Sequence, residues 1–108
     1  GMIELRREEF PEAAFTLSFL GYGDEDTHCV LELTKNHDPQ AYQNGTRFGH
    51  FAVAVLDIYA AIERCKSLGV KVTREAGPMA FASKNGQRDL IAFIEDPDGN
   101  LVELIERS

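Results

Sequence analysis

Three side chains that could bind a metal ion or move a proton fall inside apolar, strand-like segments of this sequence: Glu32, His50 and Glu103. A carboxylate at the centre of an apolar strand is costly to desolvate unless something pairs with it. An imidazole and two carboxylates together suit a divalent first-row metal such as nickel, zinc, cobalt or iron. These residue types therefore favour a metal site.

The two glutamates occupy matching places in an internal repeat. Residues 18–33 and residues 92–104 both read as two apolar strands joined by a turn. Each copy carries one glutamate in the middle of its second strand, Glu32 in the first copy and Glu103 in the second. Binding a metal ion is the simplest purpose that both could share. The alternative is that His50 binds a backbone carbonyl and that the glutamates lie at strand edges in water.

Strand alternation places each candidate among small or apolar neighbours. His50 shares a strand face with two alanines, and Glu103 shares one with Leu101 and Ile105. We therefore expect the polar groups to lie away from bulk water and the opposite faces to pack against helices. The remaining candidates are interpreted as structural: His28 and His37 as surface residues, and Asp96 and Asp98 as turn residues that bind their own backbone.

The elements that must position these residues follow from local signals. Asp57 is a typical N-cap, and apolar residues at helical spacing over residues 58–68 predict a helix that Gly69 ends. The run 96–99 predicts a tight turn in which its glycine takes a positive φ, and residues 77–86 predict a loop. Strands are predicted over residues 2–9, 15–22, 28–34, 48–55, 70–73, 90–95 and 101–105.

Length and charge bound the class of protein. A chain of 108 residues is one domain, and a net charge of −7 argues against nucleic acid and anionic membrane surfaces as partners. No apolar run has the length needed to span a membrane. The two cysteines, Cys29 and Cys65, are interpreted as reduced, buried thiols of a cytoplasmic protein.

Five segments together resemble a known family. They are residues 32–36 (Glu-Leu-Thr-Lys-Asn), 48–50 (Phe-Gly-His), 73–78, 92–99 with its Asp-Pro-Asp-Gly turn, and 102–104 (Val-Glu-Leu). In order and spacing they resemble glyoxalase I (lactoylglutathione lyase), of the vicinal oxygen chelate superfamily. The turn followed by a glutamate is common across that superfamily, whereas Glu-Leu-Thr-x-Asn combined with Gly-His is much more specific to glyoxalase I.

The resemblance implies an α+β fold of cupped mixed sheets. A complete βαβββ module over residues 48–106, within residues 47–108, would follow a truncated βββ module over residues 1–46, the two forming a single domain over 1–108. It also implies a homodimer with metal sites at its interface. The exposed edge of an incomplete sheet would favour such pairing, and the two subunits could exchange elements.

The resemblance further implies an activity: isomerisation of the hemithioacetal of methylglyoxal and glutathione to S-lactoylglutathione. Glu32, His50 and Glu103 would hold one divalent metal ion per site, nickel being favoured over zinc or cobalt. Glu103 would be the base that moves the proton, with Glu32 as a second proton carrier. Asn36 and Arg47 would contact the glutathione part of the substrate, although Arg47 lies beside the family's arginine position rather than on it.

One departure from the family pattern leads to a further expectation. The chain begins where the family's second strand begins, so the strand that carries a first histidine ligand is not in the sequence. With three ligands in place of four, we expect weaker metal binding and impaired activity. Two other classes stay open: a different enzyme of the superfamily, such as a dioxygenase or a thiol transferase, and a non-catalytic module that binds a ligand in the same cup.

Overall fold

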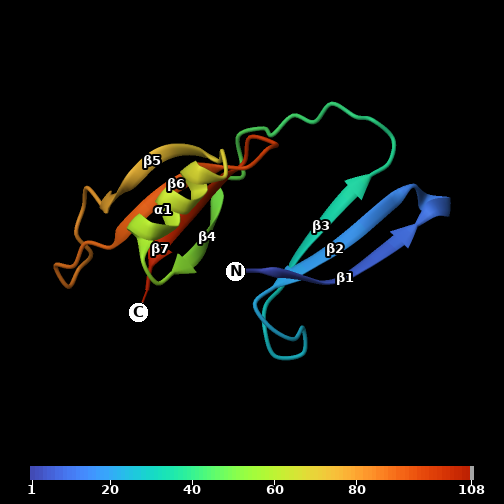
Figure 1. Cartoon of the computed structure of the whole chain (residues 1–108). Coiled ribbons are helices and arrows are strands. Elements are labelled where there is room, and N and C mark those ends of the chain that lie inside the picture. The colour runs from blue at the N-terminus through green and yellow to red at the C-terminus, as the bar shows by residue number, and fades with distance from the viewer. Residues whose placement is uncertain (108) are drawn as a thin grey trace. The chain divides into compact units, whose positions relative to one another are not determined.

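Two β-sheets, one in each part of the chain, hold most of the regular structure (Figure 1). The computed structural model describes residues 1–107 and divides the chain into two units, one over residues 1–42 and one from Gln43 onward. The predicted modules meet four residues later, between residues 46 and 47. That the two form a single domain stays a prediction, and each unit is described below by itself.

The first unit is an antiparallel sheet in the order β1-β2-β3, formed by β1 (Ile3–Phe10), β2 (Phe15–Gly21) and β3 (Leu31–Asn36). A short 3₁₀ turn, η1 (Pro11–Ala13), joins the first two strands. Strand β3 begins three residues later than predicted. The reason is a turn in which the amides of Thr27 and His28 both donate to the carbonyl of Asp24, which keeps that stretch out of the sheet.

The second unit has the predicted βαβββ order. It contains β4 (His50–Val55), α1 (Ile58–Ser67), β5 (Lys71–Pro78), β6 (Leu90–Glu95) and β7 (Leu101–Glu106). The sheet order is β4-β7-β6-β5, with β4 parallel to β7 and the other pairs antiparallel. The helix connects an edge strand to the far edge of the sheet and lies across one face (Figure 1). The predicted α+β class is confirmed.

Helix α1 begins and ends where the sequence indicates. The side chain of Asp57 accepts a hydrogen bond from the Ala60 amide at 3.0 Å, which satisfies a free donor of the first turn. A second carboxylate, that of Glu106, accepts from the Ile58 amide at 2.9 Å and so ties the helix to the end of β7. Gly69 has a φ of +76° and allows the chain to leave the helix in a left-handed conformation.

The core of the second unit lies between α1 and one face of the sheet. Ile58 and Ile62 of the helix pack against Ala92 of β6 and Leu104 of β7, and all four side chains are buried. Strand alternation explains which sheet residues join them. The partly buried side chains around this core are Val53, Val55, Ala61, Cys65, Val72, Ala76, Leu90, Ile94 and Val102.

Strand β5 is longer than predicted. The sequence predicted a strand over residues 70–73 and a loop from Gly77, but pairing with β6 continues to Pro78. Two register shifts interrupt the pairing, one between Val72 and Arg74 and one between Arg74 and Gly77. Each shift breaks the alternation of inward and outward side chains, so the segment does not read as a strand.

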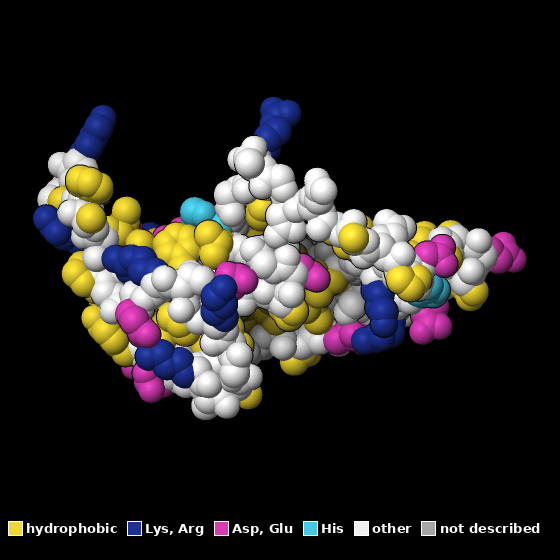
Figure 2. All heavy atoms as spheres, turned by 90° about the horizontal axis from the view of Figure 1, so that it is seen from above, with side chains coloured by type: hydrophobic (Ala, Val, Ile, Leu, Met, Phe, Trp, Pro, Cys, Tyr) yellow, Lys and Arg dark blue, Asp and Glu magenta, His cyan; other side chains and the backbone are white. Residues whose placement is uncertain are grey.

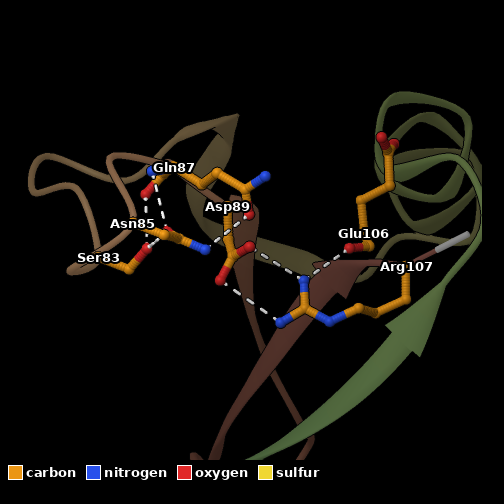
Figure 3. A network of polar contacts seen from close by, with 6 residues as sticks. All are labelled: Ser83, Asn85, Gln87, Asp89, Glu106 and Arg107. Atoms are coloured by element: carbon orange, nitrogen blue, oxygen red, sulfur yellow. Dashed lines mark hydrogen bonds and ion pairs between the residues drawn. The ribbon is translucent and has the colours of Figure 1, made fainter.

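The loop between β5 and β6 is held by short polar contacts (Figure 3). Ser83 donates to the side chain of Asn85, which also accepts from the Gln87 amide. At the end of the loop, the two terminal nitrogens of Arg107 reach the carboxylate of Asp89 at 3.1 and 3.4 Å. The start of β6 is thereby connected to the residue that follows β7.

Charges of both signs are spread over the surface. On the face seen in Figure 2, acidic and basic side chains are interspersed with exposed apolar ones, and the basic side chains form no single patch there. A phosphate backbone favours a continuous basic surface. No helix within residues 1–107 combines the length and the apolar character that crossing a bilayer requires.

Candidate active site

The face of the second sheet that does not pack on α1 carries two of the predicted site residues. From β4 this face presents His50, Ala52 and Ala54, because their neighbours Val53 and Val55 turn toward the helix. In the parallel register, Ala52 pairs with Glu103 and Ala54 with Ile105 of β7. From β6 the same face presents Ile91, Phe93 and Glu95, which pair with Ile105, Glu103 and Leu101 respectively.

The structure brings His50 and Glu103 together on this face. Their Nε2 and Oε2 atoms lie 2.9 Å apart, although 53 positions separate the residues in the sequence. The side chain of His50 is 37% exposed and that of Glu103 is 17% exposed. Glu103 is therefore largely shielded by the protein, whereas His50 is open to solvent.

An aromatic ring fixes the orientation of this pair. The ring of Phe93 meets the imidazole of His50 edge-on, with centroids 4.9 Å apart and planes at 84°. Phe93 is also the cross-strand neighbour of Glu103. Perpendicular aromatic contacts of this kind are attractive and orientation-dependent, so Phe93 restricts how the imidazole can turn.

The separation of the two polar atoms suits a shared cation. Two bonds of about 2.1 Å from a metal ion to an imidazole nitrogen and a carboxylate oxygen, at a right angle, place those atoms about 3.0 Å apart. His50 Nε2 and Glu103 Oε2 lie 2.9 Å apart. In the structure the two atoms share a direct hydrogen bond, so an ion bound by both would replace that bond and the imidazole or the carboxylate would turn toward it. Within residues 1–107, no group of three or more His, Cys, Asp and Glu side chains forms a metal-binding cluster.

The internal repeat is confirmed at the level of strand register. Glu32 of β3 pairs with Phe19 of β2, just as Glu103 of β7 pairs with Phe93 of β6. Both units therefore place a glutamate beside a phenylalanine on the same kind of strand. The expectation that the candidate side chains lie away from water is wrong for Glu32 and for His50, which are both exposed. No α-helix lies in residues 1–42 to cover the sheet that carries Glu32.

The two predicted substrate-binding residues lie outside the His50–Glu103 pair. Asn36 ends β3 in the first unit and donates from Nδ2 to the hydroxyl of Tyr42 at 2.8 Å. Arg47 is exposed in the irregular segment that precedes β4. Glu32 belongs to the first unit as well, so the structure brings together two of the three predicted metal ligands and places the third on its own sheet.

The residues interpreted as structural behave largely as predicted. His28 and His37 are exposed, and their rings contact the hydroxyls of Thr27 and Thr16 at 2.8 and 2.7 Å. Asp96 caps its own turn: its Oδ1 accepts from two downstream amides at 2.9 and 2.7 Å, which is confirmed as a structural role. Burial alone would raise the pKa of Asp96, but the hydrogen bonds outweigh it and lower the pKa.

The prediction of two buried thiols is half wrong. Cys65 packs against the core from the helix, but Cys29 is exposed because it precedes the start of β3 rather than lying within the sheet. Both cysteines are free.

Phe93 is the residue of the site that the sequence analysis missed, because an aromatic side chain on an apolar strand is usually part of the hydrophobic core. The signal that could have found it is the repeat itself: a phenylalanine pairs with the strand-centre glutamate in each copy, Phe19 with Glu32 and Phe93 with Glu103.

Comparison with known proteins agrees with this geometry. The family model described as "Glyoxalase/Bleomycin resistance protein/Dioxygenase superfamily" matches residues 5–104. A lactoylglutathione lyase of Neisseria meningitidis is 52% identical over 107 residues, covering 99% of this chain and 74% of that protein. One of Haemophilus influenzae is 47% identical over 106 residues, covering 98% and 75%.

A solved structure shows the same fold. The crystal structure of glyoxalase I from maize is 46% identical, with a TM-score of 0.89, and covers all of this chain and 37% of the maize chain. The chain thus spans about three quarters of the length of the two bacterial relatives and just over a third of the maize protein. The chain belongs to the glyoxalase, bleomycin resistance protein and dioxygenase superfamily and, within it, to the lactoylglutathione lyase (glyoxalase I) family.

Proposed function

We propose that this protein catalyses the metal-dependent isomerisation of the hemithioacetal of methylglyoxal and glutathione to S-lactoylglutathione. The main support is the His50–Glu103 pair, whose polar atoms lie 2.9 Å apart on the sheet face that does not pack on α1. Relatives about half identical over nearly the whole chain are named lactoylglutathione lyase, which supports the same reaction.

The residues of the site divide the work. His50 is proposed as a metal ligand through Nε2, and Glu103 as a ligand that also moves the proton from one carbon of the substrate to the next. A bound divalent metal supplies the positive charge that stabilises negative charge developing on the substrate oxygens. Phe93 keeps the imidazole in one orientation. Proton transfer by a carboxylate held this way contributes about 100- to 10,000-fold to the rate.

The remaining predicted site residues are part of the proposal. Glu32 is proposed as a further ligand and second proton carrier because it repeats the register position of Glu103. Asn36 and Arg47 are proposed to contact the glutathione moiety. Nickel is the favoured ion, with zinc and cobalt as alternatives, and the active assembly is proposed to be a homodimer. A cytoplasmic location is proposed from the two free cysteines.

The test combines elemental analysis of the purified protein with an assay of S-lactoylglutathione formation in the presence of Ni²⁺. The measured quantity is the ratio of wild-type to variant rates. Glu103→Gln should lower kcat by about 100-fold or more. Glu63→Gln, which removes a carboxylate that is 75% exposed on α1, is the control and should leave the rate unchanged.

Two results would refute the proposal. One is a purified protein that binds none of the three metals when they are supplied. The other is equal product formation by the wild type and Glu103→Gln. Sedimentation of the wild type as a monomer under assay conditions would refute the dimer alone.

A further inference from the structure

Arg74 lies at the most irregular point of the second sheet. In the pairing of β5 with β6, its two flanking register shifts leave β5 with extra residues on both sides. Bulged residues lose ladder hydrogen bonds, so their backbone groups need other partners. The half-buried guanidinium of Arg74 supplies these partners within the strand pair itself.

The guanidinium donates to four backbone carbonyls. From Nη1 it reaches the carbonyl of Ile91 on β6 at 2.7 Å, and those of Glu75 and Gly77 on β5 at 3.2 and 3.4 Å. From Nη2 it reaches the carbonyl of Pro78 at 2.8 Å. A single side chain therefore connects the bulged part of β5 to the first part of β6. Hydrogen bonds from a charged donor are stronger than neutral ones, which suits this bridging role.

Arg74 is connected to the His50–Glu103 pair through cross-strand neighbours. Arg74 pairs across the strands with Phe93, and Phe93 pairs with Glu103. Phe93 is also the ring that meets His50 edge-on. The Ile91 carbonyl bound by Arg74 lies two residues before Phe93 on the same strand. A shift of β6 relative to β5 would therefore move the Phe93 ring against the imidazole.

The first unit offers an internal comparison. Arg6 of β1 pairs with Phe19, which pairs with Glu32, and a register shift again precedes the arginine. There, however, the guanidinium lies over the Phe19 ring at 3.6 Å and binds the carboxylate of Glu25. The two arginines share a place in the repeat but not a set of partners. Of these two arginines, Arg74 is the one that binds bulge carbonyls, and it lies in the unit that holds His50.

We propose that Arg74 is a positioning residue: by binding the carbonyls of the β5 bulges and of β6, it sets Phe93 and, through Phe93, the orientation of the His50 imidazole. The proposal deepens the proposed function and rests on it for the role of His50 as a metal ligand. The orientation of the ring is a separate property that can be measured without metal.

The experiment uses the whole protein, four single variants and the double variant Arg74→Met/Phe93→Leu. Arg74→Met removes the donors and keeps an aliphatic chain, whereas Arg74→Lys restores part of the donor capacity. Phe93→Leu removes the ring that transmits the effect. The control is Lys66→Met, which removes the same charge and a contact with the same stretch of β5, since Lys66 Nζ lies 3.0 Å from the carboxylate of Glu75 but binds no bulge carbonyl.

Two readouts are taken: the ring-proton NMR resonances of His50 in the metal-free protein, and the affinity for Ni²⁺ by calorimetry. Arg74→Met should shift the His50 resonances and lower Ni²⁺ affinity by about 10- to 100-fold, the usual effect of losing a group that orients a ligand. Arg74→Lys should fall between Arg74→Met and the wild type, and Lys66→Met should match the wild type. Phe93→Leu should act like Arg74→Met, and the double variant should lose no more than either single variant.

The proposal is overturned if folded Arg74→Met keeps the wild-type His50 resonances, because Arg74 would then serve only the stability of β5. Should Arg74→Met fail to fold, Arg74→Lys decides: His50 resonances and Ni²⁺ affinity both equal to those of the wild type contradict the proposal. Absence of binding of Ni²⁺, Zn²⁺ and Co²⁺ by the wild type would refute the proposed function and leave the resonance test of the orientation intact.

Discussion

Truncating Ile62 tests the packing of α1 on the sheet face opposite the candidate site. Its side chain is 2% exposed and packs with Ala92 and Leu104, the strand neighbours of Phe93 and Glu103 on the opposite face. Ile62→Ala removes three buried carbons, which at about 0.8 kcal/mol each corresponds to a transfer loss of about 2.4 kcal/mol. The cavity left behind adds to this, and measured losses for such substitutions run from about 2 to 5 kcal/mol. We expect a loss of about 3 kcal/mol.

The assay is urea unfolding followed by far-UV circular dichroism. With a slope of about 2 kcal/mol per M, a loss of 3 kcal/mol lowers the midpoint by about 1.5 M. The control on the same helix is Leu68→Ala, because Leu68 is 69% exposed at its C-terminal end, and it should change stability by less than about 0.5 kcal/mol. Equal losses for the two variants would refute the assignment of Ile62 to the core.

Three further predictions concern single turns and caps. Asp57→Ala should cost about 1 kcal/mol of unfolding free energy because the Ala60 amide loses its acceptor, and Asp57→Asn, which can still cap, should cost less. Gly99→Ala should cost about 1–2 kcal/mol in urea unfolding, since φ at that position is +86°, whereas Gly49→Ala should not carry this penalty. Asp96→Asn should destabilise the protein at neutral pH, and the difference from the wild type should shrink on acidification.

The sign of the acid effect follows from the lowered pKa of Asp96. A carboxyl group whose folded pKa lies below its ordinary value of 3.8 contributes stability above that value, and the contribution is lost as the pH falls through the folded pKa. Asp98→Asn is the matched control, because it removes the same charge from the same turn. A stability gap between wild type and Asp96→Asn that persists unchanged at low pH would contradict the assignment.

Local signals in the sequence were sufficient for α1 and for most strand positions. Asp57 and Gly69 bound the helix because a cap and a left-handed exit depend only on neighbouring residues. The repeat around Glu32 and Glu103 could be predicted as well, since it follows the alternation of each strand pair.

Features that depend on strand pairing could not be predicted. The extension of β5 to Pro78 depends on two bulges and on the hydrogen bonds of Arg74, none of which leaves a periodic pattern. The contact of Phe93 with His50 depends on β4 lying beside β7 rather than beside a strand nearer in the sequence. The exposure of Cys29 depends on where the turn before β3 ends.

The parallel pairing of β4 with β7 has a consequence for how the protein is made. His50 is synthesised 53 residues before Glu103. At about 5–20 residues per second, the ribosome takes roughly 3 to 11 seconds to cover that interval. During that time strand β4, which is rich in valine and alanine, has no β7 to pair with. His50 can contact Glu103 only after β5, β6 and β7 have been synthesised, so this site forms late in translation.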